Sequence, residues 1–332
     1  MVFVWFLLAA IVTVISAIKL STYADTIGEK SSLGGMVVGT IFLAGATSLP
    51  EVTTSVSAIV LDNPDIAVGN VFGSNMFNLL IIACFDLYFR KEQIFRHAHH
   101  SHFYTASLGL LLAIVALLAL TIRIDITFLG IGVDMWILLA IYGAGVWYIS
   151  ILSKKQSSKP SEPVEEVEES KHDFSAISLK KAIIGFIIAA FVIMGAGTLL
   201  TVSGDKIAVV TGLGSSFVGS FLIAATTSLP EAVSVLVALQ LRNYNLAIGS
   251  ILGSNLFNIL ILGASDIFYQ KGSIIASISS VHQITAAGVG ILCVVVLYSL
   301  VRKPIESTFR YALPSIVLIA LYFVSSYLIF VQ

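Results

Sequence analysis

The stretch that decides the fold is Ala46-Thr47-Ser48-Leu49-Pro50-Glu51, because the chain repeats it as Thr226-Thr227-Ser228-Leu229-Pro230-Glu231. A second shared motif, Gly-x-x-x-Gly-Ser-Asn-x-Phe-Asn, follows each copy at residues 69–78 and 249–258. Matched residues are 180 positions apart, and residues 39–82 are identical to residues 219–262 at 19 of 44 positions without a gap. The chain therefore contains an internal duplication.

The composition is that of a membrane protein. Of the 332 residues, 57% are hydrophobic and 11% are charged, and the mean hydropathy is +0.98. The net charge of −1 shows no overall basic or acidic bias, so we expect no nucleic acid partner. Apolar runs of spanning length predict ten membrane helices near residues 1–22, 33–60, 66–88, 103–121, 135–153, 178–202, 213–240, 246–268, 281–300 and 312–331.

Each repeat is predicted to contain five helices. The offset of 180 residues continues outside the motifs, for example from Lys91 to Lys271. An odd number of helices per repeat places the second copy upside down relative to the first, as in many secondary transporters with ion sites at the midplane. The expected fold is an all-α membrane protein with two inverted five-helix repeats, residues 1–153 and 178–332, joined by a linker at residues 154–177.

The distribution of basic residues predicts the orientation in the cell membrane. Alternate loops on one side carry 15 of the 18 Lys and Arg residues, including those of the long linker. Because basic loops tend to remain cytoplasmic, we expect both termini outside the cell and the linker inside it. The linker has five Glu residues and few apolar ones, which is typical of a solvated segment.

Three other groups of residues were considered for function. Five acids lie near predicted helix ends, where water would reach them, so we expect structural or gating roles at most: Asp25, Asp86, Asp134, Asp205 and Asp266. Four histidines cluster before the fourth helix: His97, His99, His100 and His102. Metal binding or pH sensing is conceivable there, but an interfacial helix start is favoured because no acid or cysteine beside them completes a site. Cys84 and Cys293 are predicted to be buried thiols.

Glu51 and Glu231 differ from these acids because each lies well inside a long apolar segment with no cationic residue nearby. Ionisable groups in such positions are costly, and function is the default reason to keep them. Pro50 and Pro230 precede them and should break or kink the helix, which frees backbone carbonyls. Transporters use such broken helices to coordinate cations.

Neighbouring residues would add further oxygens to this pair. Ser74 and Asn78 are four residues apart and share one helix face, and the second repeat has the same spacing. Together the two halves would form a ring of oxygens from Glu51, Glu231, Thr47, Ser48, Thr227, Ser228, Ser74, Ser254, Asn78 and Asn258. Oxygen ligands without His or Cys suit a hard cation, and Ca²⁺ fits a flexible ring better than Mg²⁺ does.

Charge balance indicates antiport. With both Glu residues ionised, the empty site has a charge of −2 in a low-dielectric environment, which is unfavourable. One Ca²⁺, two monovalent cations or two protons would cancel this charge, so the site should change sides only when it is filled. Two close carboxylates titrate as a coupled pair, so protons should compete with calcium at low pH.

At these motifs the sequence resembles the cation/calcium antiporter superfamily, and within it the prokaryotic sodium/calcium exchangers. Residues 39–82 and 219–262 look like the two alpha-repeats of that family, and the five-plus-five layout covers the chain outside the linker. The resemblance implies exchange of cytoplasmic calcium for external sodium by alternating access, with the helices near 1–22 and 178–202 sliding past the core. It implies no cofactor and no obligate protein partner. The expected surroundings are membrane lipid.

The resemblance also implies roles for individual residues. Glu51 and Glu231 would be the central carboxylates for both ions, and oxygens would come from Thr47, Ser48, Thr227 and Ser228. Ser74 and Ser254 would line flanking sodium sites, Ala44 and Ala224 would offer backbone carbonyls, and Asn78 and Asn258 would complete the centre. The expected calcium ligands are Glu51, Glu231, Thr47 and Thr227.

One departure from the family pattern leaves the counter-ion open. Some exchangers of this type have an Asp at one of the positions of Asn78 and Asn258, and here both are Asn. A calcium/proton or potassium-linked exchanger that uses the same Glu pair is therefore the alternative. A cation channel is less well supported, because inverted repeats with broken helices favour alternating access. An enzyme is disfavoured because neither Glu has a His, Cys or Lys partner.

Overall fold

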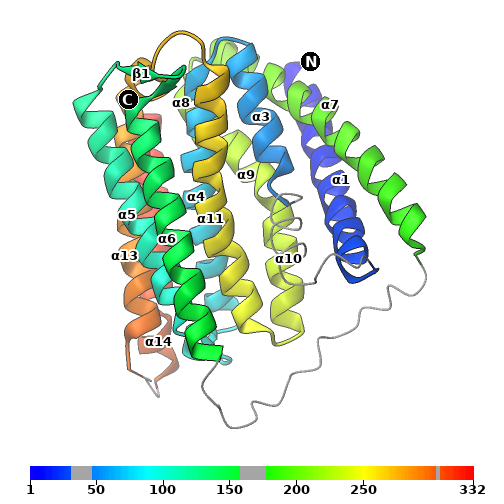
Figure 1. The fold of residues 1–332 in the computed structure, drawn as a ribbon, viewed down its shortest axis with the longest axis vertical. Coiled ribbons are helices and arrows are strands. Elements are labelled where there is room, and N and C mark those ends of the chain that lie inside the picture. Colours follow the sequence, from blue (N-terminus) through cyan, green and yellow to red (C-terminus); the bar gives the residue numbers. More distant parts are fainter. Residues whose placement is uncertain (31–46, 158–176, 304–306) are drawn as a thin grey trace.

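The protein is a bundle of long helices (Figure 1), in a computed structural model that describes residues 1–30, 47–157, 177–303 and 307–332. The long helices are α1 (Val2–Lys30), α3 (Leu49–Val60), α4 (Pro64–Tyr88), α5 (Ser101–Ile122), α6 (Val133–Ser157), α7 (Leu179–Thr211), α10 (Leu229–Gln240), α11 (Tyr244–Phe268), α13 (Val281–Val301) and α14 (Thr308–Phe330). The short elements are η1 (Ile94–His97), β1 (Thr127–Phe128), β2 (Ile131–Gly132), α8 (Ser215–Phe217), η3 (Val218–Ile223), α9 (Ala224–Thr227) and α12 (Ile274–Ser277).

Eight helices in the described part of the chain are long and apolar enough to cross a membrane. Their apolar spans contain 20 to 33 residues, and about 20 suffice for a hydrocarbon core about 30 Å thick. A ninth span forms if the bent pair of residues 215–227 and Leu229–Gln240 is counted as one. The prediction of a multi-pass helical protein is therefore confirmed, whereas the total of ten helices and the inversion of the repeats stay predictions.

Two helices are longer than the sequence predicted. α1 has 29 residues and α7 has 33, so each extends about two turns beyond the range predicted from the sequence. The polar end of α7 contains Ser203, whose Oγ donates to the carbonyl of Leu199, and Gly204, which packs against Ile223. Ser203 and Gly204 look like loop residues in the sequence, but the helix continues through them. The serine hydroxyl bonds to the helix backbone, and the glycine fits against a neighbouring segment.

The helices that carry the second motif form the centre of the bundle. Of the residues in the membrane-spanning stretch of α4, 94% are buried inside the protein. The corresponding share is 67% in α11 and 17% in α1. α4 contacts α3, α11, α13, α14 and η3. A helix that is enclosed by other helices on all sides is a core helix. The polar residues of the repeated motifs are therefore held in the interior of the protein.

α1 and α7 form a separate pair at one side of the bundle (Figure 1). Their contact has its own small hydrophobic cluster, distinct from the main core, made of Ala17, Leu20, Ala24, Ala189 and Ile193. Small residues at this contact let the two helices approach closely. The pair also contacts α3, where Thr201 Oγ1 donates to the carbonyl of Thr54 over 3.2 Å.

A short β-hairpin joins α5 to α6, which the all-α prediction missed. β1 and β2 pair antiparallel through Thr127–Gly132 and Phe128–Ile131. Leu129 and Gly130 between them both have positive φ angles, 54° and 78°, as a tight hairpin turn requires. The sequence signal was weak because each strand has only two residues.

Candidate functional site

The proline motifs interrupt the helices, as the sequence predicted. In the second repeat α9 ends at Thr227 and α10 begins at Leu229, and the helical stretch of residues 215–227 is bent by 41° relative to α10. Ser228 between them has φ −88° and ψ 2°, and Ser48 before α3 has nearly the same values, −89° and 7°. Glu51 and Glu231 consequently lie in the first turn of a new helix, where backbone N–H groups and the helix dipole favour a negative charge.

The two glutamates are fully enclosed and poorly partnered. Glu51 is 2% exposed and Glu231 is 1% exposed. Ser228 Oγ donates to Oε1 of Glu51 over 3.4 Å, while Oε2 of each glutamate has no hydrogen-bond partner among the described residues. The two carboxyl groups are close enough to interact electrostatically, and neither forms an ion pair with any described cation. Such a pair requires a bound cation or proton to compensate its charge.

Four asparagines connect α4 and α11 in a reciprocal pattern. Asn78 Nδ2 donates to Oδ1 of Asn255 over 3.0 Å, and Asn258 Nδ2 donates to Oδ1 of Asn75 over 2.8 Å. Asn75 and Asn255 occupy the same position in the two repeats, as do Asn78 and Asn258. These bonds occupy the amide nitrogens of Asn78 and Asn258 and leave both of their Oδ1 atoms buried and without a partner. Both oxygens are therefore available to a cation.

The repeats also contact one another through hydroxyl groups. Thr227 Oγ1 lies 3.4 Å from Oγ of Ser74 and donates to Oδ1 of Asn70 over 3.2 Å. Together with the bond from Ser228 to Glu51, these contacts place the broken helix of the second repeat against α3 and α4 of the first. The structure therefore brings together Glu51, Ser228, Ser74 and Thr227.

Few contacts with the glutamate pair are described for the remaining predicted ligands. Ser48, Thr47 and Ser254 are buried at 1%, 6% and 4% exposure, and Oγ of Ser48 has no hydrogen-bond partner among the described residues. The carbonyl of Ala224 already accepts from Ser228 N over 3.1 Å and from Thr227 Oγ1 over 3.3 Å. Ala44 lies outside the described residues. The ion ligation expected of these residues stays a prediction.

Asn70, which was not predicted as a site residue, bonds to the first turns of α3 around Glu51. Its Nδ2 donates to Thr54 Oγ1 over 2.8 Å, to Ser55 Oγ over 3.0 Å and to the carbonyl of Glu51 over 3.3 Å. All of these side chains are fully buried. The equivalent of Asn70 in the second repeat is Ser250, so a search for repeated polar residues does not find it.

Gly73 explains how the two halves come so close. A Cβ at this position would overlap the backbone of Ser220, and one at Gly69 would lie 3.0 Å from the backbone nitrogen of Ser220. Ser220 belongs to η3, a π-helical segment immediately before the broken helix. π-Helical segments often occur at functional sites. The lack of a side chain at Gly69 and Gly73 therefore permits this close approach.

Three of the acids expected at water-accessible helix ends are instead buried, and that expectation was wrong. Asp86 and Asp266 are 0% exposed and Asp134 is 5% exposed. Asp86 accepts from Tyr311 Oη and Ser315 Oγ, both at 2.5 Å. Asp266 accepts from the backbone nitrogens of Gly132 (2.6 Å) and Ile274 (2.8 Å). Loops and neighbouring helices cover these helix ends. The position of an acid near the end of a predicted helix does not reveal this cover.

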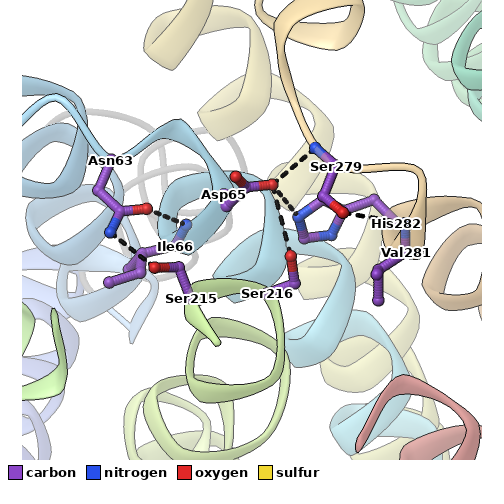
Figure 2. A network of polar contacts seen from close by, with 8 residues as sticks. All are labelled: Asn63, Asp65, Ile66, Ser215, Ser216, Ser279, Val281 and His282. Carbon is purple, nitrogen blue, oxygen red and sulfur yellow. Dashed lines mark hydrogen bonds and ion pairs between the residues drawn. The ribbon is translucent and has the colours of Figure 1, made fainter. Parts of the chain in front are cut away.

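A further polar network lies at the end of the bundle where α4 and α13 begin (Figure 2). Asp65 Oδ1 accepts from Ser279 N (2.8 Å) and lies 3.1 Å from Nε2 of the fully buried His282 and 3.4 Å from Oγ of Ser216. Asn63 Nδ2 donates to Asp205 Oδ1 over 2.6 Å. The network connects α4, α7, α8 and α13 at the same end as both termini (Figure 1). The sequence did not predict this network, because its residues are far apart in the chain.

The histidines before α5 do not assemble a metal centre with other residues. His97 stacks on Tyr244 with ring centroids 4.8 Å apart, and the backbone nitrogen of His99 donates to Asn245. Within the described ranges, no group of three or more His, Cys, Asp or Glu side chains is arranged to hold a metal ion. Cys293 is buried as predicted, but Cys84 is exposed on the outer face of α4, so that prediction was wrong.

Comparison with known proteins identifies the family. The family model described as sodium/calcium exchanger protein matches residues 1–151 and 181–331. The chain belongs to the sodium/calcium exchanger protein family. This exchanger is 27% identical over 267 residues to the putative antiporter CaxA of Alkalimonas amylolytica, with 79% of each chain covered. It is 37% identical to the sodium/calcium exchanger MaX1 of Methanosarcina acetivorans over 59 residues, 18% of this chain and 17% of that one.

Solved structures show the same fold as this exchanger. Native YfkE superposes with a TM-score of 0.67 at 15% identity, covering 98% of this chain and 92% of that one. A structure of the sodium-calcium exchanger NCX_Mj with sodium and calcium gives a TM-score of 0.57 at 21% identity, covering 97% and 96%. Family membership makes this exchanger a multi-pass membrane transporter for cations, with calcium and sodium as the ions that the family exchanges, and points away from an enzyme.

Proposed function

We propose that this exchanger is a secondary antiporter that moves calcium against sodium across the cell membrane by alternating access. The observation that carries the proposal is the enclosed pair of Glu51 and Glu231, in which one oxygen of each carboxylate has no hydrogen-bond partner among the described residues. A buried carboxylate in this condition is strongly unfavourable unless a cation or a proton compensates it. The fold removes two negative charges from water and leaves their compensation to the transported ions.

The unpartnered oxygens of the two repeated motifs suit calcium. Besides the two glutamates, they include Oδ1 of Asn78 and of Asn258 and Oγ of Ser48. Calcium accepts about six to eight oxygens, carboxylate, amide and hydroxyl alike, in a flexible geometry. We assign calcium to Glu51, Glu231, Thr47 and Thr227, and sodium to flanking positions lined by Ser74 and Ser254 with the backbone of Ala44 and Ala224.

The separate packing of α1 and α7 suggests what moves. This pair has its own hydrophobic cluster and contacts the bundle through α3 and through η3, α8, α9 and α10 of the second repeat. Movement of such a pair past the bundle would open the glutamates to one side and then to the other. In this proposal residues 1–153 and 178–332 are inverted repeats, the linker at 154–177 is cytoplasmic and both termini are outside.

The test is calcium uptake into proteoliposomes that contain sodium, with sodium, potassium or choline outside at fixed pH. Uptake that requires an outward sodium gradient is the expected result. Uptake that ignores sodium and follows a pH gradient would assign proton exchange through the same Glu pair, and the sodium sites would be withdrawn. Calcium flux that needs no counter-ion and does not saturate would indicate a channel instead.

A further inference from the structure

A basic cavity lies outside the region of the glutamates, at the end of the bundle opposite the two termini (Figure 1). It has a volume of about 670 Å³ and opens where α5 begins, α13 ends and α14 begins. Its cationic and titratable lining residues are Arg96, His99, His100, Arg302 and Lys303. None of the described residues that line it is an Asp or a Glu. The charge of this cavity is therefore complementary to an anion.

Arg302 is held in place with one donor group unused. Its guanidinium carbon lies 4.3 Å above the ring of Tyr311, and its Nη1 donates to the carbonyl of Tyr311 over 2.6 Å. Tyr311 is itself fixed, because its hydroxyl donates to Asp86 and accepts from the backbone nitrogen of Phe95. Nη2 of Arg302 is buried without a hydrogen-bond partner among the described residues. An unpaired buried donor is costly, and an anionic oxygen is the acceptor that satisfies it best.

The acid behind this arginine does not occupy the cavity. Asp86 is fully buried and is not among the lining residues, and its two carboxylate oxygens accept from Tyr311 and Ser315. Arg96 and Lys303 are both exposed at the rim. Asp86 interacts electrostatically with Arg302 from behind the cavity, but no described acid forms an ion pair with Arg302, Arg96 or Lys303, so these cations can bind an anion.

The surroundings place the cavity at the edge of the membrane. Exposed apolar and aromatic side chains flank it on α5, α13 and α14: Phe103 (39% exposed), Tyr104 (40%), Tyr298 (60%), Val301 (64%) and Phe309 (72%). Side chains of this kind at the ends of spanning helices mark the membrane–water interface. A ligand here therefore needs an anionic head group in the cavity and an apolar part beside the helices.

We propose that this cavity binds the phosphate head group of an anionic phospholipid, with Arg302 as the central ligand and Arg96 and Lys303 at the rim. A guanidinium binds phosphate through two parallel hydrogen bonds, which a lysine ammonium cannot reproduce. Basic pockets between membrane helices bind anionic head groups in the same way. The proposal does not depend on which ions the exchanger transports.

The test is lipid binding by the purified full-length exchanger in detergent, measured by native mass spectrometry with phosphatidylglycerol and phosphatidylcholine. Wild-type protein is expected to retain phosphatidylglycerol in preference to phosphatidylcholine. Arg302→Gln is expected to weaken phosphatidylglycerol binding about tenfold, because it removes a charge-assisted hydrogen bond. Arg302→Lys, which keeps the charge without the planar fork, should give an intermediate affinity.

Two further variants separate lipid binding from folding. Arg96→Gln combined with Lys303→Gln changes only exposed side chains, so it should fold normally and still lose affinity for phosphatidylglycerol. Lys181→Gln is the matched control, because Lys181 is an exposed cation on the same predicted side of the membrane and does not line the cavity. It should bind phosphatidylglycerol as the wild type does.

Three results would overturn the proposal. The first is equal retention of the two lipids by the wild type, and the second is unchanged binding in the Arg96/Lys303 double variant. The third is displacement of phosphatidylglycerol by inorganic phosphate at comparable concentration, which would show a site for a free anion instead of a lipid.

Discussion

Two pairs of buried acids occupy matching positions in the two repeats, and their surroundings are opposite. Asp86 and Asp266 are 180 residues apart, as are Glu51 and Glu231, and all four are at most 2% exposed. Each aspartate accepts two hydrogen bonds of 2.8 Å or less, whereas the bond from Ser228 to Glu51 is 3.4 Å long and Oε2 of each glutamate has no hydrogen-bond partner among the described residues. Burial alone therefore does not mark an ion site.

The difference shows how one membrane protein uses buried charge for two purposes. At the aspartates, hydrogen bonds from the protein replace water, so the acid stabilises the junction of helices and loops. At the glutamates the protein withholds those bonds, so that an ion can supply them. A transported ion must also leave, and incomplete coordination by the protein permits this.

The strongest test of this comparison is to neutralise the glutamates. Glu51→Gln and Glu231→Gln should each reduce calcium transport by at least about a hundredfold, because the loss of one carboxylate from a buried cation removes more than about 2.7 kcal/mol. Stability should be retained or increased, since an uncompensated buried charge is removed. Calcium uptake in proteoliposomes and thermal unfolding in detergent measure the two effects. Retained exchange in both variants would refute the proposed centre.

The converse test is to neutralise an aspartate. Asp266→Asn should lower the free energy of unfolding by about 1–3 kcal/mol, because the new amide nitrogen would face one of the backbone N–H donors of Gly132 and Ile274. Calcium affinity should be unchanged in the folded fraction. Thermal unfolding and calcium titration by calorimetry provide the measurements.

Asp86→Asn is the matched control for Asp266→Asn. Its closest donors are the hydroxyls of Tyr311 and Ser315, and a hydroxyl can rotate to accept from an amide nitrogen. The loss of stability should therefore be smaller than for Asp266→Asn. A loss of calcium affinity in either variant would contradict the division into structural and ion-binding acids.

A change of pH should also distinguish the two pairs. As the pH falls, the glutamate pair takes up protons and its charge is neutralised, so calcium affinity should decrease. The decrease should approach about tenfold per pH unit where one proton is displaced for each calcium bound. Calorimetric titration at a series of pH values measures this slope, which Asp86→Asn should leave unchanged. A calcium affinity independent of pH would remove protons from the mechanism.

The smallest expected effect comes from adding a carboxylate to the glutamate pair. Asn258→Asp places an acid oxygen opposite Oδ1 of Asn75, where an amide nitrogen now donates over 2.8 Å. Asn75 must turn its amide, or the new acid must stay protonated, so sodium and pH dependence should change more than folding does. The half-saturating sodium concentration should shift by up to about tenfold, or about 1.4 kcal/mol. An unchanged sodium titration and pH profile would argue against a place for Asn258 beside the ions.

The sequence by itself determined the class of protein and the outline of the fold. Apolar runs mark the spans because lipid requires every backbone polar group to be paired within a helix. Pro230 and Glu231 marked the broken helix, because a proline removes a backbone donor wherever it stands. The duplication showed which polar residues belong together, since two copies of an unpaired Glu in an apolar segment need a common reason.

Only the tertiary structure decided which buried acids are satisfied and which are not. Asp86 finds Tyr311 and Ser315 more than 200 residues away, and Asp65 finds His282. Asn70 and the basic cavity around Arg302 likewise depend on segments that are distant in sequence. The physical reason is that hydrogen bonding and burial are properties of neighbours in space, whereas hydrophobicity and helix breaking are properties of the residues themselves.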